Sequence, residues 1–469
     1  SCKPELDIYG RIKQKAFMSD MIITNHYKIA SLDDEFMQSV QYFIIDEADQ
    51  FGRAIRNSLS FEVSSKELRV FISRLNGSSR RGYLMLLDEY VQGLKRKLTP
   101  GEKEKALLLI KQAKRSLIEL DGLIKNAGEM FIYHLPEWEQ RKIKRGIKSH
   151  EDFLLEKLPG LNDGKIMKKY CELISGMMGL LYQKLKEISE MDKIAQRHRD
   201  RSRTYALLSE DFSSTIKTTG EEFNNDEVAH SLRMVNEKEW VITRHQVYIG
   251  EFLQETFYSK GKKMVYTSAT LSVNNTFDHF KTQYGVDETM LKVNETSIGT
   301  LLDHGTQSVA IVDLSVTQYN YKNPEAMKQW RQDITKSIGL YGWAANGRTL
   351  VLFTNIMDMN YSFKYLKPFF QQFDIQPLIQ NGSSLEEIDE FRRNEFSILF
   401  GVDRFWSGVD FPGVTLSQVI IVKAPNPSLS DPVIQHRILH ESDFMSKDYN
   451  TIARLKLKQG AGRLLRNER

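Results

Sequence analysis

The chain has 469 residues, and its 65 lysines and arginines nearly balance its 61 aspartates and glutamates, which gives a formal net charge of +4. This length suits two or three domains, and this charge permits nucleic-acid binding without indicating it. Cys2 and Cys171 are the two cysteines, which excludes a disulfide framework and a self-contained four-cysteine metal site. With no signal peptide and no apolar run of transmembrane length, we expect a cytoplasmic protein without membrane contact.

The first part of the chain contains two short apolar runs that predict buried strands. Residues 21–24 form the first run, and Asn25 after it is a suitable helix cap. The second run, residues 42–45, leads directly into Asp46 and Glu47. Ligands of open α/β sheets bind at the carboxyl ends of strands, where one carboxylate can hold Mg²⁺ and a second can activate water. An acidic pair in a solvated loop is the alternative interpretation.

From about residue 60 to residue 203, long helical patterns replace the strand signals. Two stripes of apolar residues recur at alternating spacings of 3 and 4, as in the core of a helical bundle. We expect these stripes to face each other. Their members are Ile110, Ala113, Leu117, Leu120, Ile124 and Ala127 in the first, and Ile166, Tyr170, Leu173, Met177 and Leu180 in the second.

Strand signals return after about residue 205. The candidates are residues 239–242, 264–266, 308–312, 349–353, 397–400 and 418–422. Helical stretches separate most of the last four, which predicts a mostly parallel sheet.

Short polar motifs follow several of these strands in a fixed order. They are Asp46-Glu47-Ala48-Asp49, Ser268-Ala269-Thr270, Thr354-Asn355, the stretch from Phe405 to Gly413, and the stretch from Gln459 to Arg466. Each motif alone has a structural alternative, such as a helix cap, a turn or a solvated helix face. The order of all five would rarely arise by chance.

These motifs resemble those of the XPD/DinG type of superfamily 2 helicases over nearly the whole chain. The most specific marker is motif V, which has the form F-W-x-G-V-D-x-P-G. The matching stretches are residues 46–49 for motif II, 267–271 for motif III, 350–355 for motif IV, 401–413 for motif V and 459–466 for motif VI.

The resemblance implies an α/β fold of two RecA-like parallel-sheet domains, the first carrying a large all-helical, arch-like insertion. We expect the first motor domain at residues 1–59, the insertion at 60–203, the rest of the first domain at 204–275 and the second motor domain at 276–469. The family's phosphate-binding G-x-x-x-x-G-K-[ST] loop does not occur in the sequence. We therefore expect a first domain truncated at its N-terminus and a chain that is inactive as an ATPase on its own.

The resemblance also implies ATP and Mg²⁺ between the two domains, with single-stranded DNA, or RNA, across them. Asp46 would hold Mg²⁺, and Glu47 would position the attacking water. The catalytic residues implied from motif VI are Gln459, Arg463 and Arg466. The two arginines suit bidentate contact with phosphate. Further nucleotide contacts would be Ser268, Thr270, Gly408 and Asp410. Nucleic-acid contacts would be Asn25, Thr354, Asn355, Arg404 and Trp406, of which Trp406 could equally belong to the core.

Three departures from the family pattern narrow the resemblance. Only Cys2 precedes the strand before Asn25, where many relatives have four cysteines, so we expect no iron–sulfur cluster. Ser407 replaces a usual glutamate, and Asp49 replaces a common histidine.

The chain resembles best the Gram-positive branch that lacks the cluster and carries a DnaQ-like 3′–5′ exonuclease domain at its N-terminus. We expect a helicase core that acts in DNA repair, recombination or replication. The alternative is an inactive-helicase module that binds nucleic acid and nucleotide and regulates the linked exonuclease.

Overall fold

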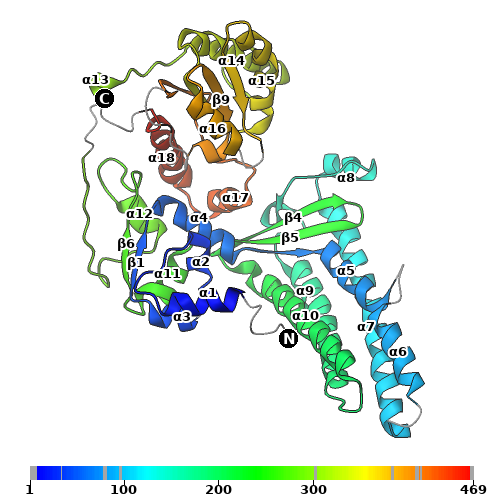
Figure 1. Ribbon diagram of the computed structural model, residues 1–469. Coiled ribbons are helices and arrows are strands. Elements are labelled where there is room, and N and C mark those ends of the chain that lie inside the picture. Colours follow the sequence, from blue (N-terminus) through cyan, green and yellow to red (C-terminus); the bar gives the residue numbers. More distant parts are fainter. Residues whose placement is uncertain are drawn as a thin grey trace.

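The computed structural model describes residues 8–32, 34–77, 82–94, 98–299, 304–381, 385–406, 411 and 415–464, and its strands form three sheets within these ranges (Figure 1). Two sheets are parallel and one is antiparallel. We refer to the part around the first parallel sheet as the first part. The middle region is residues 60–246, and the second part is residues 304–464. No helix in the described ranges is both long and apolar enough to span a bilayer.

The first part is built on β1 (Tyr42–Ile45) and β6 (Lys263–Tyr266), which pair in parallel. Phe43 and Ile45 are buried on one face of this pair, against helices that include α4. The expected strand at residues 21–24 is wrong, because this segment has no strand partner and Ile23 is 92% exposed. The helices are α1 (Ile8–Phe17), α2 (His26–Ala30), α3 (Asp34–Ser39), α4 (Ala48–Leu59), α11 (Gly250–Leu253), the π-helical turn η4 (Gln254–Tyr258), and α12 (Asp278–Gln283).

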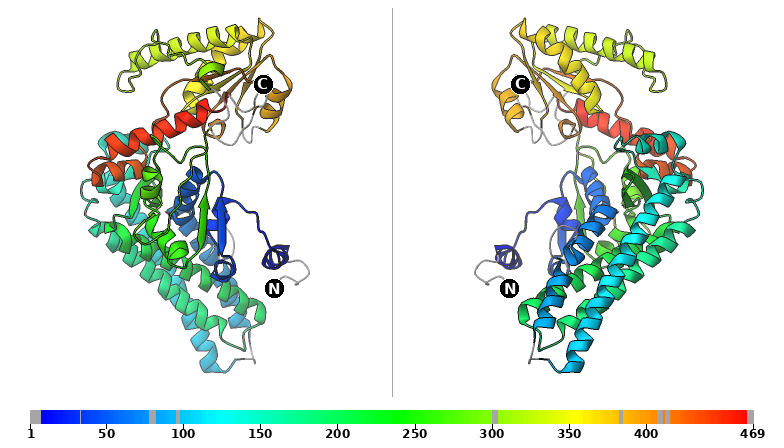
Figure 2. Two further views of the ribbon diagram at one scale, coloured as in Figure 1. Left: turned by 90° about the vertical axis from the view of Figure 1, so that its left-hand side faces the viewer. Right: turned by 90° about the vertical axis from the view of Figure 1, so that its right-hand side faces the viewer.

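Long helices of the middle region extend away from the second part, as both side views show (Figure 2). They are α5 (Ser65–Asn76), α6 (Tyr83–Gly93), α7 (Pro100–His134), α8 (Glu137–Lys144), α9 (Lys165–Ser189) and α10 (Gln196–Glu221), with the short turns η2 (Leu155–Lys157) and η3 (Glu222–Asn224). A capping box starts α7, because Thr99 and Glu102 satisfy each other's backbone amides. All six residues of the predicted α7 stripe are buried, which confirms it.

The second predicted stripe is wrong by one position along α9. Leu173 and Leu180 are 44% and 46% exposed, whereas Ile174 and Leu181 are 3% and 0% exposed. Both stripes are apolar in the sequence, and the packing of α9 against α7 and α10 selects the later one.

The middle region is not all-helical, which corrects the expectation for an arch-like insertion. It contains an antiparallel sheet in the order β2-β5-β4-β3. The strands are β2 (Phe61–Ser64), β3 (Phe153–Leu154), β4 (Val228–Asn236) and β5 (Glu239–Gln246). Trp240 anchors this sheet to α7, because its indole N–H donates to the carbonyl of Ile124 at 3.0 Å. The expected boundary after residue 203 falls inside α10, so it divides a continuous helix.

The second part contains a four-stranded parallel sheet in the order β10-β7-β9-β8. Helices cover both of its faces, and the side chains of its strands belong to two buried apolar clusters. Its strands are β7 (Thr349–Leu352), β8 (Gln376–Ile379), β9 (Ser397–Gly401) and β10 (Gln418–Ile421). Its helices are α13 (His304–Gln307), α14 (Pro324–Ala344), α15 (Ile356–Gln371), α16 (Leu385–Arg393), α17 (Pro432–His440) and α18 (Asn450–Ala461), with the shorter turns η5 (Asp403–Phe405) and η7 (Met445–Tyr449).

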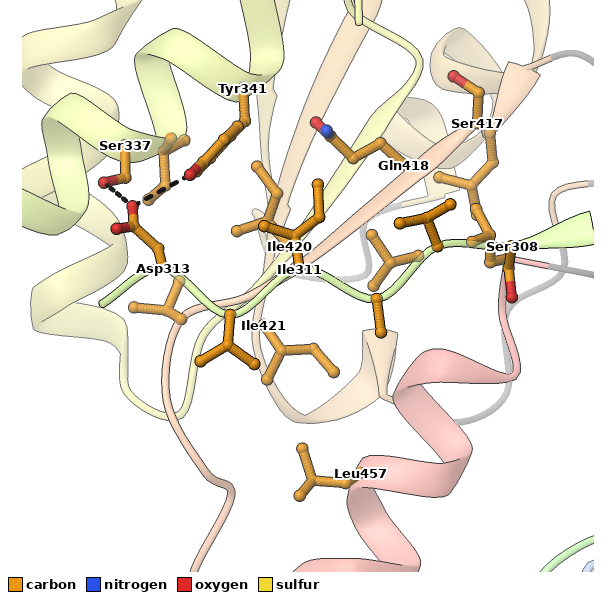
Figure 3. A pocket seen from close by; sticks show the side chains of 18 of the residues that line it. Ser308, Ile311, Asp313, Ser337, Tyr341, Ser417, Gln418, Ile420, Ile421 and Leu457 are labelled. Carbon is orange, nitrogen blue, oxygen red and sulfur yellow. Dashed lines mark hydrogen bonds between the residues drawn. The ribbon is translucent and has the colours of Figure 1, made fainter. Parts of the chain in front are cut away.

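Three of the four strands predicted for the second part are confirmed, and the strand at residues 308–312 is wrong. That segment runs beside β10 without strand pairing, and Val309 and Ile311 are 83% and 73% exposed. Together with β10 it encloses a cavity of about 1410 Å³ with mainly aliphatic walls (Figure 3). Asp313 at its end accepts hydrogen bonds from the hydroxyls of Ser315 at 2.6 Å and Ser337 at 2.7 Å, and such bonds lower the pKa of this carboxyl to about 2.

Candidate functional site

Asp46 and Glu47 lie at the carboxyl end of β1, at the turn into α4. The Asp46 side chain accepts a hydrogen bond from the amide of Glu47 at 2.9 Å, and the imidazole of His26 donates to the Asp46 carbonyl at 2.8 Å. Glu47 has φ 47° and ψ 47°, a left-handed conformation that is strained for a residue with a side chain. Both carboxylates are exposed, so this turn presents two acids to solvent at the edge where the sequence predicted them.

The ladder between β1 and β6 continues past the strands and brings the Ser268-Ala269-Thr270 motif to the same edge. The amide of Thr267 donates to the carbonyl of Ile45 at 2.9 Å, and the amide of Ala48 donates to the carbonyl of Thr267 at 3.0 Å. Ser268 therefore lies beside the first turn of α4, where its hydroxyl donates to the carboxylate of Asp49.

Gln459 on α18 reaches from the second part to this edge of the first part. Its side-chain amide donates to the other carboxylate oxygen of Asp49 and to the hydroxyl of Thr270 at 3.1 Å. Asp49 thus accepts hydrogen bonds from both parts of the molecule. The sequence placed Asp49 in motif II, after a predicted strand and in place of a common histidine, but it did not predict these contacts with Ser268 and Gln459.

A buried tyrosine fixes the start of α4 behind these residues. The hydroxyl of Tyr284 donates to the carbonyl of Ala48 and accepts from the amide of Gly52 at 2.7 Å. Burial raises the pKa of Tyr284, so the hydroxyl keeps the proton that it donates. Tyr284 is a positioning residue, because it acts on the helix that carries Asp49.

The hydrogen bonds that the structure describes for Arg463 lie within the second part and not at this edge. It is 7% exposed, and its Nε and a terminal guanidinium nitrogen donate to the carbonyl of Trp406 at 3.3 and 3.1 Å. Trp406 is itself 1% exposed, and its indole N–H donates to the carbonyl of Phe353 at 2.9 Å. The sequence left two interpretations of Trp406 open, and its burial favours a core side chain of the second part over a nucleic-acid contact.

The remaining expected nucleic-acid residues lie at the surface or cap helices. Asn25 accepts a hydrogen bond from the amide of Lys28 at 2.9 Å and caps α2, as the sequence predicted. Asn355 caps α15 and accepts from the amide of Asp358 at 2.8 Å, whereas Thr354 is half-buried and Arg404 is exposed. The expected residues that lie outside the described ranges are Gly408, Asp410 and Arg466.

The aliphatic cavity beside β10 is separate from this site, because none of the expected site residues lines it. Of the two cysteines, Cys2 lies outside the described residues, and Cys171 is buried in the middle region, where burial raises the pKa of its thiol to about 12. The expected lack of an iron–sulfur cluster stays a prediction.

Comparisons with known proteins match this chain to helicase-related proteins. The family model described as "Helicase C-terminal domain" matches residues 342–469. The chain is 24% identical to "3'-5' exonuclease DinG" of Bacillus subtilis, over 98% of this chain and 50% of that protein. It is 24% identical to "ATP-dependent DNA helicase DinG" of Photobacterium profundum, over 98% of this chain and 66% of that protein. "ATP-dependent DNA helicase YoaA" of Escherichia coli is 28% identical over 47% of this chain and 33% of its own length.

The chain spans about half the length of the Bacillus subtilis relative and of a second exonuclease DinG, from Staphylococcus saprophyticus, of which it covers 49%. The parallel-sheet parts are consistent with a helicase RecA-like fold. This chain carries a helicase C-terminal domain and is a homologue of the proteins named DinG and YoaA.

Proposed function

We propose that the chain is the helicase core of a DinG-like protein and binds ATP with Mg²⁺ between its first and second parts. The observation that carries this proposal is the contact of Gln459 with Asp49 and Thr270. These residues come from motifs far apart in the sequence, and they meet at the carboxyl edge of the β1–β6 pair. This is the position at which α/β sheets bind ligands.

The donor set of this edge suits the proposed ligand. Asp46 and Glu47 offer exposed carboxylate oxygens, the ligands that Mg²⁺ prefers. A bound Mg²⁺ would neutralise charge on the phosphates. Glu47 would orient water, and Gln459 would sense whether the two parts are closed on each other. Arg463 would contact phosphate only after exchanging its bonds to the carbonyl of Trp406.

We infer that this chain alone binds nucleotide weakly and does not hydrolyse it at a helicase rate. Backbone amides and the lysine of a G-x-x-x-x-G-K-[ST] loop supply much of the phosphate binding in such motors, and the sequence has no such loop.

We also propose a division of the chain that follows the sheets. The middle region, residues 60–246, is an insertion that leaves after α4 and returns before α11. The first motor domain then comprises residues 8–59 and 247–299, because α12 packs on the β1–β6 pair and the expected boundary after residue 275 would remove it. The second motor domain comprises residues 304–464. Single-stranded DNA would cross both motor domains. Asn25, Thr354, Asn355 and Arg404 remain its candidate contacts.

The proposal is tested by titrating the chain with a fluorescent ATP analogue and Mg²⁺. Gln459→Ala removes a hydrogen bond to a carboxylate, worth roughly 1.5–3 kcal/mol, so we expect affinity to fall by about tenfold or more. Gln371→Ala, at an exposed position at the end of α15, is the matched control and should bind as the wild type does. Equal affinity in all three proteins would overturn the placement of the nucleotide.

The alternative function is a nucleotide-responsive module of a linked 3′–5′ exonuclease. The name of the Bacillus subtilis relative, "3'-5' exonuclease DinG", is the observation that suggests it. In a longer protein with such a nuclease, ATP would then change the nuclease rate without DNA-stimulated ATP turnover. A helicase motor would show that turnover.

A further inference from the structure

A second cluster of titratable side chains lies where α17 of the second part packs against the antiparallel sheet of the middle region (Figure 1). Asp431 caps α17 by accepting a hydrogen bond from the amide of Val433 at 2.9 Å, and Pro432 occupies the first helical turn. The side chain of Val433 packs into the small apolar cluster that includes Leu154 and Ala229. These contacts hold α17 in one place on the sheet.

Two histidines one turn apart on α17 face a single carboxylate of the middle region. Oε1 of Glu156, in η2, lies 2.7 Å from Nδ1 of His436, and Oε2 lies 2.8 Å from Nε2 of His440. The two imidazole rings are stacked, with centroids 4.2 Å apart. One nitrogen from each ring and a carboxylate oxygen all lie within 4.8 Å of one another.

The outer nitrogens of both rings face oxygens of one further residue, Asp226. Nε2 of His436 donates to the main-chain carbonyl of Asp226 at 3.0 Å, and Nδ1 of His440 lies 3.7 Å from a carboxylate oxygen of Asp226. In the neutral ring, a proton on Nε2 of His436 leaves Nδ1 unprotonated. The lone pair of Nδ1 is then directed at the cluster. Metal-binding histidines are typically oriented in this way, with the second ring nitrogen bonded to a carbonyl or carboxylate.

We propose that Glu156, His436 and His440 form a binding site for a divalent transition metal ion of the zinc class. Two imidazoles and one carboxylate are a ligand set that zinc accepts, with water in the remaining position. The side chain of His440 is 38% exposed, which gives an ion and its water access from solvent, whereas His436 is 2% exposed and anchors the site. This proposal does not depend on the nucleotide site.

An ion would enter after the three ligand atoms, which lie within 4.8 Å of one another, move to the spacing of a metal site. Ligand atoms bonded to zinc at about 2.0–2.1 Å lie roughly 3.3 Å apart in a tetrahedral site. The Glu156 carboxylate, on a short turn, would therefore withdraw by about 0.5 Å from each ring. Asp226 and Glu156 would together balance the charge of the ion.

Protons are the natural competitors of the metal at these three residues. Burial alone would lower the pKa of His436, but its hydrogen bond and charge interaction with Glu156 raise it overall. Burial alone would raise the pKa of Glu156, but the two histidines lower it. A metal ion must displace any proton from the ligand atoms, so its binding weakens as the pH falls.

Other charged groups near α17 do not occupy this site. Arg437 on the same helix binds Glu441 and Asp448. His230 of the neighbouring sheet is buried, and burial lowers its pKa to about 3, so it remains neutral.

A bound ion would join the helicase C-terminal domain to the middle region. Both histidines belong to the stretch that the helicase C-terminal model matches, whereas Glu156 and Asp226 belong to the middle region. An ion at their meeting point would resist separation of these two units, since binding only to the joined state stabilises it.

The experiment is a calorimetric titration of the EDTA-treated, dialysed chain with Zn²⁺ and a parallel titration with Co²⁺ followed by visible absorbance. We expect one tight Zn²⁺ site and a Co²⁺ spectrum typical of four-coordination. His440→Gln and Glu156→Gln should each weaken Zn²⁺ binding by about 100-fold or more, and Asp226→Asn should weaken it by about 10–100-fold. His150→Gln, at an exposed position outside the cluster, should bind as the wild type does.

His440 is the decisive position, because it is partly exposed and its loss leaves the buried His436 in place. Far-ultraviolet circular dichroism and the melting temperature without metal verify that each variant is folded. Wild-type binding that is lost in His440→Gln but kept in His150→Gln supports the site. No tight Zn²⁺ binding by the wild type, or equal binding by all four variants, would overturn it and leave only the hydrogen bonds within the cluster.

Discussion

The β1–β6 pair and the sheet of the second part are both parallel, but they differ in how many of their faces are covered. All five residues of β9 are buried, and so are all four of β7. In β1 only Phe43 and Ile45 are buried, whereas Tyr42 and Ile44 are each 74% exposed. Val265 of β6 is 55% exposed on the same pair of strands.

The difference shows what an apolar run can and cannot predict. The apolar runs of β1, β7 and β9 were correct signals for strands, because β-branched and aromatic residues suit a pleated sheet. Burial on both faces depends on helices from elsewhere in the chain. Two apolar clusters enclose the second sheet, whereas one cluster lies against the β1–β6 pair among the described residues. Parallel sheets are usually covered on both faces, so the exposed face of the β1–β6 pair is the feature that distinguishes it from the second sheet.

The largest effect should follow from truncating the core of the covered sheet. Phe400 in β9 is fully buried and packs in an edge-to-face contact with Phe363. We expect Phe400→Ala to lower the free energy of unfolding of the second part by about 3–5 kcal/mol, since it removes a buried ring and leaves a cavity. Urea unfolding followed by circular dichroism measures the loss. A change below about 1 kcal/mol would show that this sheet is not packed as described.

The contact between the two parts should give the next largest effect. Asp49→Ala and Gln459→Ala remove the two ends of one hydrogen bond, whose carboxylate acceptor makes it worth roughly 1.5–3 kcal/mol. A double-mutant cycle on the free energy of unfolding should therefore show a coupling of about 1–2 kcal/mol. Pairing Asp49→Ala with the distant Gln371→Ala is the control and should show additive effects. Additivity in the first cycle as well would mean that the two parts do not meet at this edge.

Arg463 should have an effect of comparable size, and its variants separate a structural role from a role in the nucleotide response. Arg463→Ala deprives the Trp406 carbonyl of its partner, so we expect a loss of about 1–3 kcal/mol in the free energy of unfolding. Arg463→Lys can keep one of the bonds and should recover part of that stability. Neither variant should respond to ATP as the wild type does, because lysine cannot make the bidentate contact with phosphate. A normal ATP response in Arg463→Lys would contradict the role of this arginine at the nucleotide.

Local patterns of the sequence predicted much of this architecture. The strands around residues 42–45, 349–353 and 397–400 and the buried stripe of α7 are confirmed, because hydrophobic periodicity determines them locally. Strand β8 gave no such signal, since it has four residues and contains Pro377, which its edge position tolerates. Strands β2 and β4 depend on pairing with β5 across the middle region, and the sequence alone does not show that pairing.

The sequence suggested which residues belong to the candidate site, but it did not suggest the contacts between them. Strand-end reasoning put Ser268 and Thr270 at this edge, whereas Gln459 was expected only from the resemblance to motif VI. The structure brings the three side chains together. The role of Asp49 as their common partner depends on the side-chain directions of two separate parts. The burial of Trp406 depends on packing under α18, where a Cβ on Gly460 would lie 3.0 Å from its ring. Spacing along the chain does not contain this information.

The smallest effect should come from the bare face of β1. Threonine keeps the β-branched shape of isoleucine but has a hydroxyl in place of the ethyl group. Ile44→Thr therefore tests burial with little change in strand propensity. Because Ile44 is 74% exposed, the hydroxyl remains hydrated, and we expect a change within about 0.5 kcal/mol in the free energy of unfolding.

Ile398→Thr in β9 is the matched control, because Ile398 is fully buried in the covered sheet. The same substitution there buries a hydroxyl and removes apolar packing, so we expect a loss of about 2 kcal/mol or more. Urea unfolding of both variants makes the comparison directly. If Ile44→Thr is as damaging as Ile398→Thr in this chain, the exposed face of β1 is already covered in solution. If it becomes damaging only in a longer protein, the added segment is what covers that face.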